Sequence, residues 1–380
     1  MSKYENYTPT ELLRELCMAF GPSGCEGNVA DMIREIVAPY ADEVYGDKLG
    51  TVIAVYKKRA EKAGYDLEEE PKSDSGKIAC ERLMLCAHMD EVGFMIKSID
   101  GDGYLHIAAL SGKDPKLLAG RNVTVGDEER KTIGYFGVKP AHLGGMGDFN
   151  SLYIDIGAKD KKDAEERVQV GDFGTYRSDF VRFGEGGHKL KGKAIDDRLG
   201  CVVLCEVLRR LKESDAKLPF DVCCAFVCRE EIGAGSAQTA ANLIKPDVAI
   251  CIDGGGGADT PDLKSSGEVR MGKGPVMTLY NFHGRGTLNG TIAHPAMVRL
   301  VEKTAEENSI FLQYKAYVGG LTDLSYVQLE GTGVKCIDLG FPGRYAHSPC
   351  EVVDMADVDQ CAQLVAAVVG NIHRDTDFSR

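Results

Sequence analysis

Acidic and histidine side chains follow short hydrophobic runs at several widely separated places in this chain. His88 and Asp90 follow RLMLCA, Glu230 and Glu231 follow DVCCAFVCR, and Asp253 follows VAICI. In an α/β protein the carboxyl ends of parallel strands meet at one edge of the sheet, where residues distant in sequence converge. The pattern therefore predicts an α/β fold with a polar site at that edge.

Two further segments carry the same residue types. Asp196 and Asp197 stand in KAIDDRLG before a predicted helix, and His347 stands in RYAHSPCE after the strand-like run VKCIDLG. Two imidazoles and several carboxylates suit a pair of divalent ions such as zinc, cobalt or manganese. A single carboxylate can bridge two ions that lie about 3.5–4 Å apart. We predict the metal ligands to be His88, Asp196, Glu231, Asp253 and His347.

The spacing of these residues also assigns roles to their neighbours. His88 and Asp90 are two positions apart, so on a strand they share a face, and Asp90 can orient the His88 ring for catalysis. Asp197 is expected to cap the helix or to pair with Arg198. Arg344 is equally compatible with a clamp for a substrate anion and with a structural salt bridge.

Glu230 and Glu231 are expected to do different jobs. Adjacent residues on a strand point to opposite faces, unless the chain bends, which Gly233 and Gly235 would allow. We predict Glu231 as the ligand and Glu230 as the catalytic general base. Taken singly, each motif also has a simpler interpretation, such as a helix cap or a solvated acid pair; only the combination favours a metal centre.

Bulk composition narrows the partners and the compartment. A chain of 380 residues has room for two domains. Its formal charge of −13 argues against nucleic acid and anionic membranes as partners. No apolar run approaches the roughly 20 residues that span a bilayer, and MSKYENYTPTELLREL lacks the features of a signal peptide. Thirteen cysteines without a C-x-x-C pair are interpreted as buried, reduced thiols, so we expect a cytoplasmic protein.

The middle of the chain differs from its two flanks. Residues 98–187 are rich in glycine and in short strand-like runs such as GYLHIAAL and SLYIDIGA, which indicates a small β-barrel or sandwich. The flanks alternate strands and helices in a doubly wound pattern. We therefore predict a catalytic α/β domain from residues 1–97 and 188–380, with the β domain of 98–187 inserted. The charged segment Lys57–Glu81 is expected to be an exposed loop.

These residues also resemble the M42 aminopeptidases, the group of glutamyl and tetrahedral (TET) aminopeptidases. The matching blocks run nearly from end to end: GPSGCE, CAHMDEVGFM, GKAIDDRLG, CREEIGAGSA, ADTP, MGKGP, GGLTD and RYAHSPCE. Two features depart from the family pattern, namely the length of the segment Lys57–Glu81 and the glycine run after Asp253.

The resemblance implies a zinc-peptidase-like fold with an inserted PDZ-like β domain. It implies the same metal ligands, Glu230 as general base, two divalent metal ions per subunit and peptide substrates with a free N-terminus. It also implies a homo-oligomer, a tetrahedral dodecamer.

Several alternatives stay open at this stage. A related two-metal carboxypeptidase or N-deacylase would share the ligands and would act on blocked peptides. An endoglucanase-type glycoside hydrolase would use paired carboxylates and would survive removal of metal. A non-catalytic scaffold is disfavoured, because the ligand set is intact.

Overall fold

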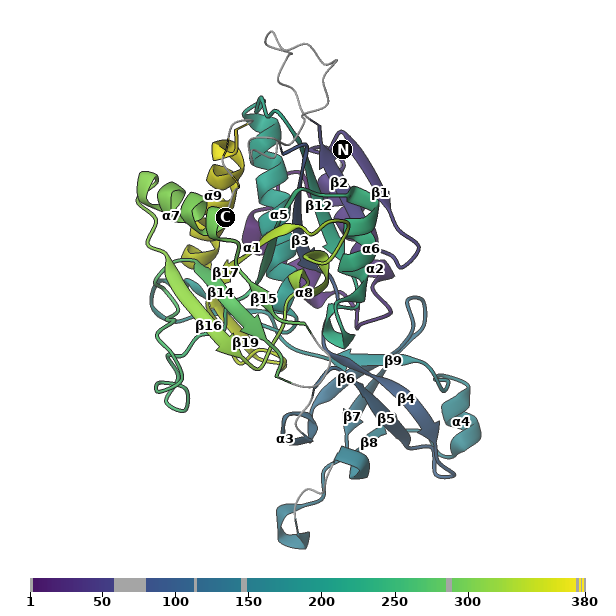
Figure 1. Ribbon diagram of the computed structural model, residues 1–380. Coiled ribbons are helices and arrows are strands. Elements are labelled where there is room, and N and C mark those ends of the chain that lie inside the picture. Colours follow the sequence, from purple (N-terminus) through teal and green to yellow (C-terminus); the bar gives the residue numbers. More distant parts are fainter. Residues whose placement is uncertain are drawn as a thin grey trace.

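A nine-stranded mixed β-sheet forms the centre of the computed structural model, counted over the residues that it describes, 3–57, 80–112, 115–144, 149–284, 289–373, 376 and 378 (Figure 1). The loop expected over Lys57–Glu81 lies almost wholly outside these residues. Among the described residues, no helix is both long and apolar enough to cross a membrane.

The order of the strands places several chain segments at one edge of the sheet. Across the sheet the strands are β1 (Glu43–Gly46), β2 (Val52–Tyr56), β12 (Asp221–Val227), β3 (Arg82–His88), β13 (Val248–Gly254), β17 (Lys335–Phe341), β14 (Val276–Phe282) and β15 (Thr291–Ile292), and β16 (Gln313–Val318) also pairs with β14. The central strands β12, β3, β13 and β17 run parallel. Their carboxyl ends therefore meet, and the segments that follow them carry the predicted site residues.

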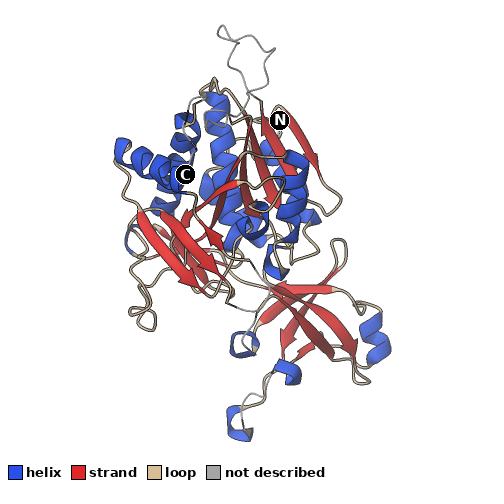
Figure 2. Cartoon of the chain, viewed as in Figure 1, coloured by secondary structure: helices blue, strands red, loops and turns tan. Residues whose placement is uncertain are grey.

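Helices cover both faces of this sheet (Figures 1 and 2). One core is shared with α1 (Pro9–Met18), α2 (Gly27–Val37), α5 (Ile195–Glu213), α7 (Pro295–Glu307) and α9 (Met355–Asn371), and the other with α6 (Gly235–Ile244) and α8 (Leu324–Val327). Alternate residues of one strand supply the two cores: Leu83 and Leu85 of β3 face the first set of helices, and Met84 and Cys86 face the second. The predicted α/β class and its helix-covered sheet are confirmed.

A closed barrel forms the second part of the molecule, a separate lobe in Figure 1. Its strands are β4 (Gly93–Ile99), β5 (Leu105–Leu110), β8 (Tyr153–Asp155), β7 (Lys131–Phe136), β6 (Asn122–Gly126) and β9 (Phe173–Tyr176), with the short helices α3 (Pro115–Leu118) and α4 (Lys161–Glu165). All neighbouring strands are antiparallel, and residues such as Phe94 and Phe136 form a core of its own. The barrel starts before residue 98 and ends before residue 187, so the predicted domain bounds stay a proposal.

A small antiparallel sheet follows the barrel in the chain. It consists of β10 (Val181–Phe183), β11 (Lys189–Gly192), β19 (Glu351–Asp354) and β18 (Gly343–Arg344). The pairing of β11 with β19 brings the segment before α5 beside the RYAHSPCE segment, although the two are far apart in sequence. Short 3-10 turns occupy Ala141–Leu143, Phe149–Ser151, Glu185–Gly187 and Glu230–Ile232.

The alternation of strands and helices predicted for the two flanks is present in the α/β part. Strands β1 and β2 form a hairpin, and Asp47 Oδ1 accepts the backbone N–H groups of Leu49, Gly50 and Thr51 in its turn. Strand β14 and helix α6 were not predicted. The run VMTLYNF, rich in residues that favour strands, indicates β14, and the alanine-rich segment GSAQTAANLI indicates α6.

A fully buried ion cluster fastens α5 to the segments around the sheet edge. The Arg198 guanidinium donates to the carbonyl oxygens of Met89, Leu16, Ala19 and Gly21 and to Glu91 Oε1. Lys193 Nζ lies 2.6 Å from both carboxylate oxygens of Glu91, and Thr175 Oγ1 of β9 donates to Oε2. The Glu91 carboxylate thus holds α5, the barrel and the loop after α1 together.

Replacing Glu91 with glutamine should destabilise the protein strongly. The change leaves two buried cations without their counter-charge, which typically costs about 3–5 kcal/mol. Urea denaturation followed by circular dichroism measures the loss in the free energy of unfolding. The control is Asp127→Asn, which breaks an exposed pair with Arg130 and should cost at most about 1 kcal/mol. Equal effects of the two changes would contradict this account of the cluster.

Candidate metal centre

The predicted ligands come from different elements that meet at the sheet edge. His88 is the last residue of β3, Asp253 lies near the end of β13, and Asp196 lies at the start of α5. Glu231 lies in the 3-10 turn after β12, and His347 follows β18. All of them line one cavity of about 1230 Å³. The structure therefore brings together every ligand that the sequence predicts.

Asp196 stands between the two imidazoles. Its Oδ1 lies 3.3 Å from His88 Nε2, and its Oδ2 lies 3.6 Å from His347 Nε2. His347 Nε2 is in turn 3.4 Å from Glu231 Oε2. The two oxygens of one carboxylate thus face two separate nitrogen donors, which is the arrangement of a ligand that bridges two ions.

The potential ligand atoms divide into two groups around this carboxylate. Asp196, Glu231 and His347 form one, and His88 and Asp253 form the other together with Asp197; within each group the ligand atoms lie within 4.8 Å of one another. Asp197 is already engaged, because its Oδ1 accepts the N–H of Gly200 and its Oδ2 the N–H of His88. Asp197 therefore links the first turn of α5 to the end of β3, and Asp196 remains the predicted ligand shared by both groups.

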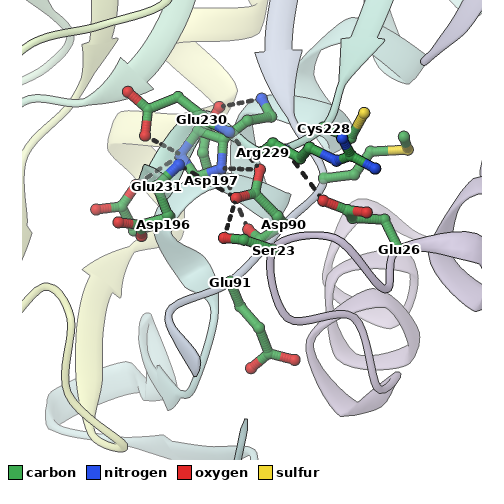
Figure 3. Close-up of polar contacts among 12 residues, drawn as sticks. Ser23, Glu26, Asp90, Glu91, Asp196, Asp197, Cys228, Arg229, Glu230 and Glu231 are labelled. Atoms are coloured by element: carbon green, nitrogen blue, oxygen red, sulfur yellow. Dashed lines mark hydrogen bonds and ion pairs between the residues drawn. The ribbon is translucent and has the colours of Figure 1, made fainter. Parts of the chain in front are cut away.

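The buried Asp90 carboxylate contacts several groups of the centre and holds them in place. Its side chain has no exposed surface, and its Oδ1 lies 3.4 Å from His88 Nδ1. It also accepts hydrogen bonds from the backbone N–H groups of Glu230 and Glu231, at 3.0 and 3.1 Å, and from Ser23 Oγ at 2.6 Å (Figure 3). One carboxylate therefore fixes both the imidazole ring and the turn that presents the two glutamates.

The chain bends just before Glu230 and Glu231, at Arg229. Arg229 has a left-handed backbone, with φ of 62°, and the 3-10 turn starts at the next residue. The expectation that Gly233 or Gly235 provides the bend was wrong, although Gly233 also has a positive φ. Because the chain leaves the strand at Arg229, the strand alternation no longer applies, and both carboxylates can line the same cavity.

Several residues that support the centre were not predicted. Glu351 accepts the N–H groups of Asp196 and of His347, at 2.9 and 3.0 Å. Glu26 accepts the N–H of Arg229, and Ser111 Oγ at the end of β5 donates to Glu231 Oε2 at 2.8 Å. Glu351 and Glu26 lie in the recognisable blocks RYAHSPCE and GPSGCE, so the sequence carried a signal for them. No sequence pattern indicated Ser111, because only the position of the folded barrel brings it beside Glu231.

Of the two roles predicted for Arg344, an anion clamp and a structural salt bridge, the structure shows the salt bridge. Its guanidinium forms a bidentate ion pair with Asp259, with Nε 2.8 Å from Oδ1 and Nη2 2.5 Å from Oδ2. Both planar groups are thereby engaged with one another. The loop that carries His347 is held on one side by this pair and on the other by Glu351.

The centre holds more negative charge than its own cations balance. Burial raises the pKa of Glu230 and of Asp253 well above the usual carboxylate range, and the neighbouring acids raise it further. Burial alone would lower the pKa of His88, but Asp196 and Asp90 raise it well above its usual value. Neighbouring carboxylates contribute to the raised pKa of all three groups, and a bound cation would oppose this effect.

Two divalent ions fit these donors. The centre supplies the nitrogen and oxygen ligands that zinc, cobalt and manganese accept. Glu231 Oε1 is buried and has no hydrogen-bond partner within the described part of the chain. A buried carboxylate oxygen in this state is costly unless it binds a proton or a cation. The donor set therefore fits a pair of ions, with His88 and Asp253 on one side of Asp196 and Glu231 and His347 on the other.

Comparisons with known proteins find relatives that cover nearly the whole chain. The family model described as M42 glutamyl aminopeptidase matches residues 73–364. The chain is 35% identical to the putative aminopeptidase SgcX of Escherichia coli (strain K12), over 96% of this chain and 94% of that protein. It superposes on an aminopeptidase of the archaeon Desulfurococcus kamchatkensis with a TM-score of 0.86, at 30% identity over 97% of this chain and 96% of that one. The TET1 peptidase of Pyrococcus horikoshii, which can assemble into a tetrahedron or a large octahedral shell, gives a TM-score of 0.80 at 29% identity over 96% and 100% of the two chains.

Replacing Glu351 with alanine should weaken metal binding. The change frees the backbone of both Asp196 and His347, and loss of such a supporting contact typically lowers metal affinity about 10–100-fold. Titration against a chromophoric chelator measures the affinity, and circular dichroism checks the fold. Glu185→Ala, at an exposed position, is the control and should leave the affinity unchanged. Unaltered affinity in a folded Glu351 variant would show that Glu351 does not position the ligands.

Proposed function

This chain belongs to the M42 family of glutamyl aminopeptidases, and from that premise we propose that it removes N-terminal residues from peptides with two divalent metal ions. It is a peptidase, a hydrolase of peptide bonds. The observation that carries the two-metal proposal is the position of Asp196, whose two oxygens face His88 and His347 separately.

The proposed ligands are His88, Asp196, Glu231, Asp253 and His347, and the ions are zinc or cobalt, with manganese as a third candidate. When bound, such ions lower the pKa of a water molecule, polarise the peptide carbonyl and attract a free α-amine. The charge of the centre and the nitrogen and oxygen donors support this assignment. The cavity is large enough to admit the end of a peptide chain.

Glu230 is the proposed general base. It lines the cavity without being needed as a ligand, and its Oε2 lies 4.0 Å from His88 Nε2. A carboxylate accepts the proton of the attacking water and later gives it to the leaving amine, which needs a pKa nearer neutrality than usual. Asp90 keeps Glu230 in place through its backbone N–H.

We also propose that the chain forms a homo-oligomer, a tetrahedral dodecamer, in the cytoplasm. The structural likeness to the Pyrococcus horikoshii TET1 peptidase supports the assembly. The cysteines are all free thiols, which is typical of proteins in a reducing compartment. Sedimentation velocity of the purified protein tests the assembly: a single species of twelve chains is expected, and a monomer at all concentrations would refute it.

The Glu230→Gln variant should keep its metal and lose its activity. Glutamine has the same shape but cannot take up a proton, and loss of a general base typically costs about 10²–10⁴-fold in rate. Hydrolysis of aminoacyl-p-nitroanilides gives kcat, and elemental analysis gives the metal content. Glu302→Gln, at an exposed position of α7, should match the wild type in both. A kcat near the wild-type value in the Glu230 variant would remove Glu230 from the proposed role.

Chelation and blocked substrates separate aminopeptidase action from its alternatives. Exhaustive chelation should abolish hydrolysis, and zinc or cobalt should restore it, because the buried carboxylates need a cation to act together. Peptides with a free N-terminus should be cleaved and their N-acetylated forms should not. Cleavage of only the acetylated forms would favour an N-deacylase, and activity that survives chelation would favour a metal-free hydrolase.

A further inference from the structure

Two thiols and a carboxylate meet in the core one layer below the candidate metal centre. Cys86 precedes His88 by two residues on β3, and Cys251 precedes Asp253 by two residues on β13, and the register of these parallel strands places Cys86 opposite Cys251. Asp323 precedes α8, which covers this face of the sheet. The ligand atoms of Cys86, Cys251 and Asp323 lie within 4.8 Å of one another.

Asp323 has no other explanation in the described part of the chain. Its side chain is 1% exposed, and neither carboxylate oxygen has a hydrogen-bond partner among the described residues. It stands at the N-cap position of α8 but makes no capping hydrogen bond. A carboxylate that is buried without a partner is costly by several kcal/mol, and native proteins keep such a group only when something compensates it.

The core around this cluster is largely apolar. The residues packed around it include Met84, Ala249 and Leu324, which have no donor side chain. The two thiols are fully buried and share a side-chain hydrogen bond with one another. Their sulfur atoms also make long contacts to carbonyl oxygens, Cys86 Sγ to Ile250 O at 3.8 Å and Cys251 Sγ to Ile252 O at 3.9 Å. Both sulfur atoms and a carboxylate oxygen of Asp323 thus lie within 4.8 Å of one another.

We propose that Cys86, Cys251 and Asp323 hold a structural zinc ion, separate from the two ions of the proposed catalytic centre. Two sulfurs and a carboxylate oxygen select a borderline-soft ion such as zinc. Tetrahedral bonds of about 2.0–2.3 Å separate ligand atoms by roughly 3.3–3.8 Å, so atoms that lie within 4.8 Å of one another need to approach by at most about 1.5 Å. Binding displaces the thiol protons to solvent, since thiolates are the ligands.

Such an ion would fasten the helix α8 to the strands that carry His88 and Asp253. Without it, α8 is a short helix held on this face by apolar contacts of Leu324 and Val327. With it, β3, β13 and α8 share one rigid point directly behind the catalytic ligands. The ion therefore serves the position of the centre and takes no part in its chemistry.

The wild-type protein tests the proposal without any substitution. Zinc X-ray absorption of the reduced protein, saturated with zinc and then desalted, should show sulfur in the coordination shell, and elemental analysis should give three zinc ions per chain. The proposed catalytic centre contains only nitrogen and oxygen donors, so it cannot supply a sulfur signal. A shell of nitrogen and oxygen alone, with at most two zinc ions per chain, would overturn the third site and leave the catalytic proposal intact.

Variants locate the sulfur ligands. Cys251→Ser and Asp323→Asn should each lower the content from three zinc ions to two, and the serine variant should also lose the thiolate-to-cobalt absorption seen after cobalt loading. Cys223→Ser is the matched control, because Cys223 is equally buried on the same side of the sheet but lies opposite Met84; it should keep three ions. Three ions and full sulfur signal in folded Cys251→Ser would place the sulfur ligands elsewhere and refute the assignment.

Discussion

The excess of carboxylates at the carboxyl edge of the central sheet governs the rest of this structure. Asp196, Glu230, Glu231 and Asp253 line one cavity, where His88 and His347 lie within 4 Å of these carboxylates. Like charges at this range repel strongly once water is removed. Cations are the simplest compensation, and the surrounding hydrogen bonds have already fixed the carboxylates in positions that cations can use.

A second buried cluster lies behind the centre, and in it the positive charges outnumber the negative one. Glu91 is surrounded by Lys193 and Arg198, so there two cations share one carboxylate, and in Figure 3 its side chain points away from the site. Glu91 follows Asp90 directly, and the two neighbours serve different purposes. Asp90 positions the ligands, and Glu91 fixes the chain that carries Asp90. The precision of the centre thus depends on a buried ion cluster that begins one residue away.

The ligand types and their strand ends could be predicted from the sequence, because hydrophobic runs followed by acids or histidine report directly on the edge of a parallel sheet. The two-residue spacing of His88 and Asp90 also indicated that Asp90 orients the His88 ring. The bend at Arg229 could not be predicted, since a left-handed non-glycine residue leaves no compositional trace. Glu351 and Glu26 stood in recognisable blocks, but their partners are backbone N–H groups, whose positions only the folded chain defines.

The barrel is joined to the centre at both of its ends, which limits how it can be oriented. Its first strand starts shortly after His88, and the chain returns through β11 to Asp196 at the start of α5. Between these ends, Ser111 donates to Glu231 from the barrel side, and Thr175 in β9 donates to Glu91. A movement of the barrel therefore disturbs a ligand and the buried ion cluster at the same time. Because both contacts are buried or partly buried, the inserted lobe is part of the architecture of the site, and any assembly that fixes the lobe also fixes the proposed ligand Glu231.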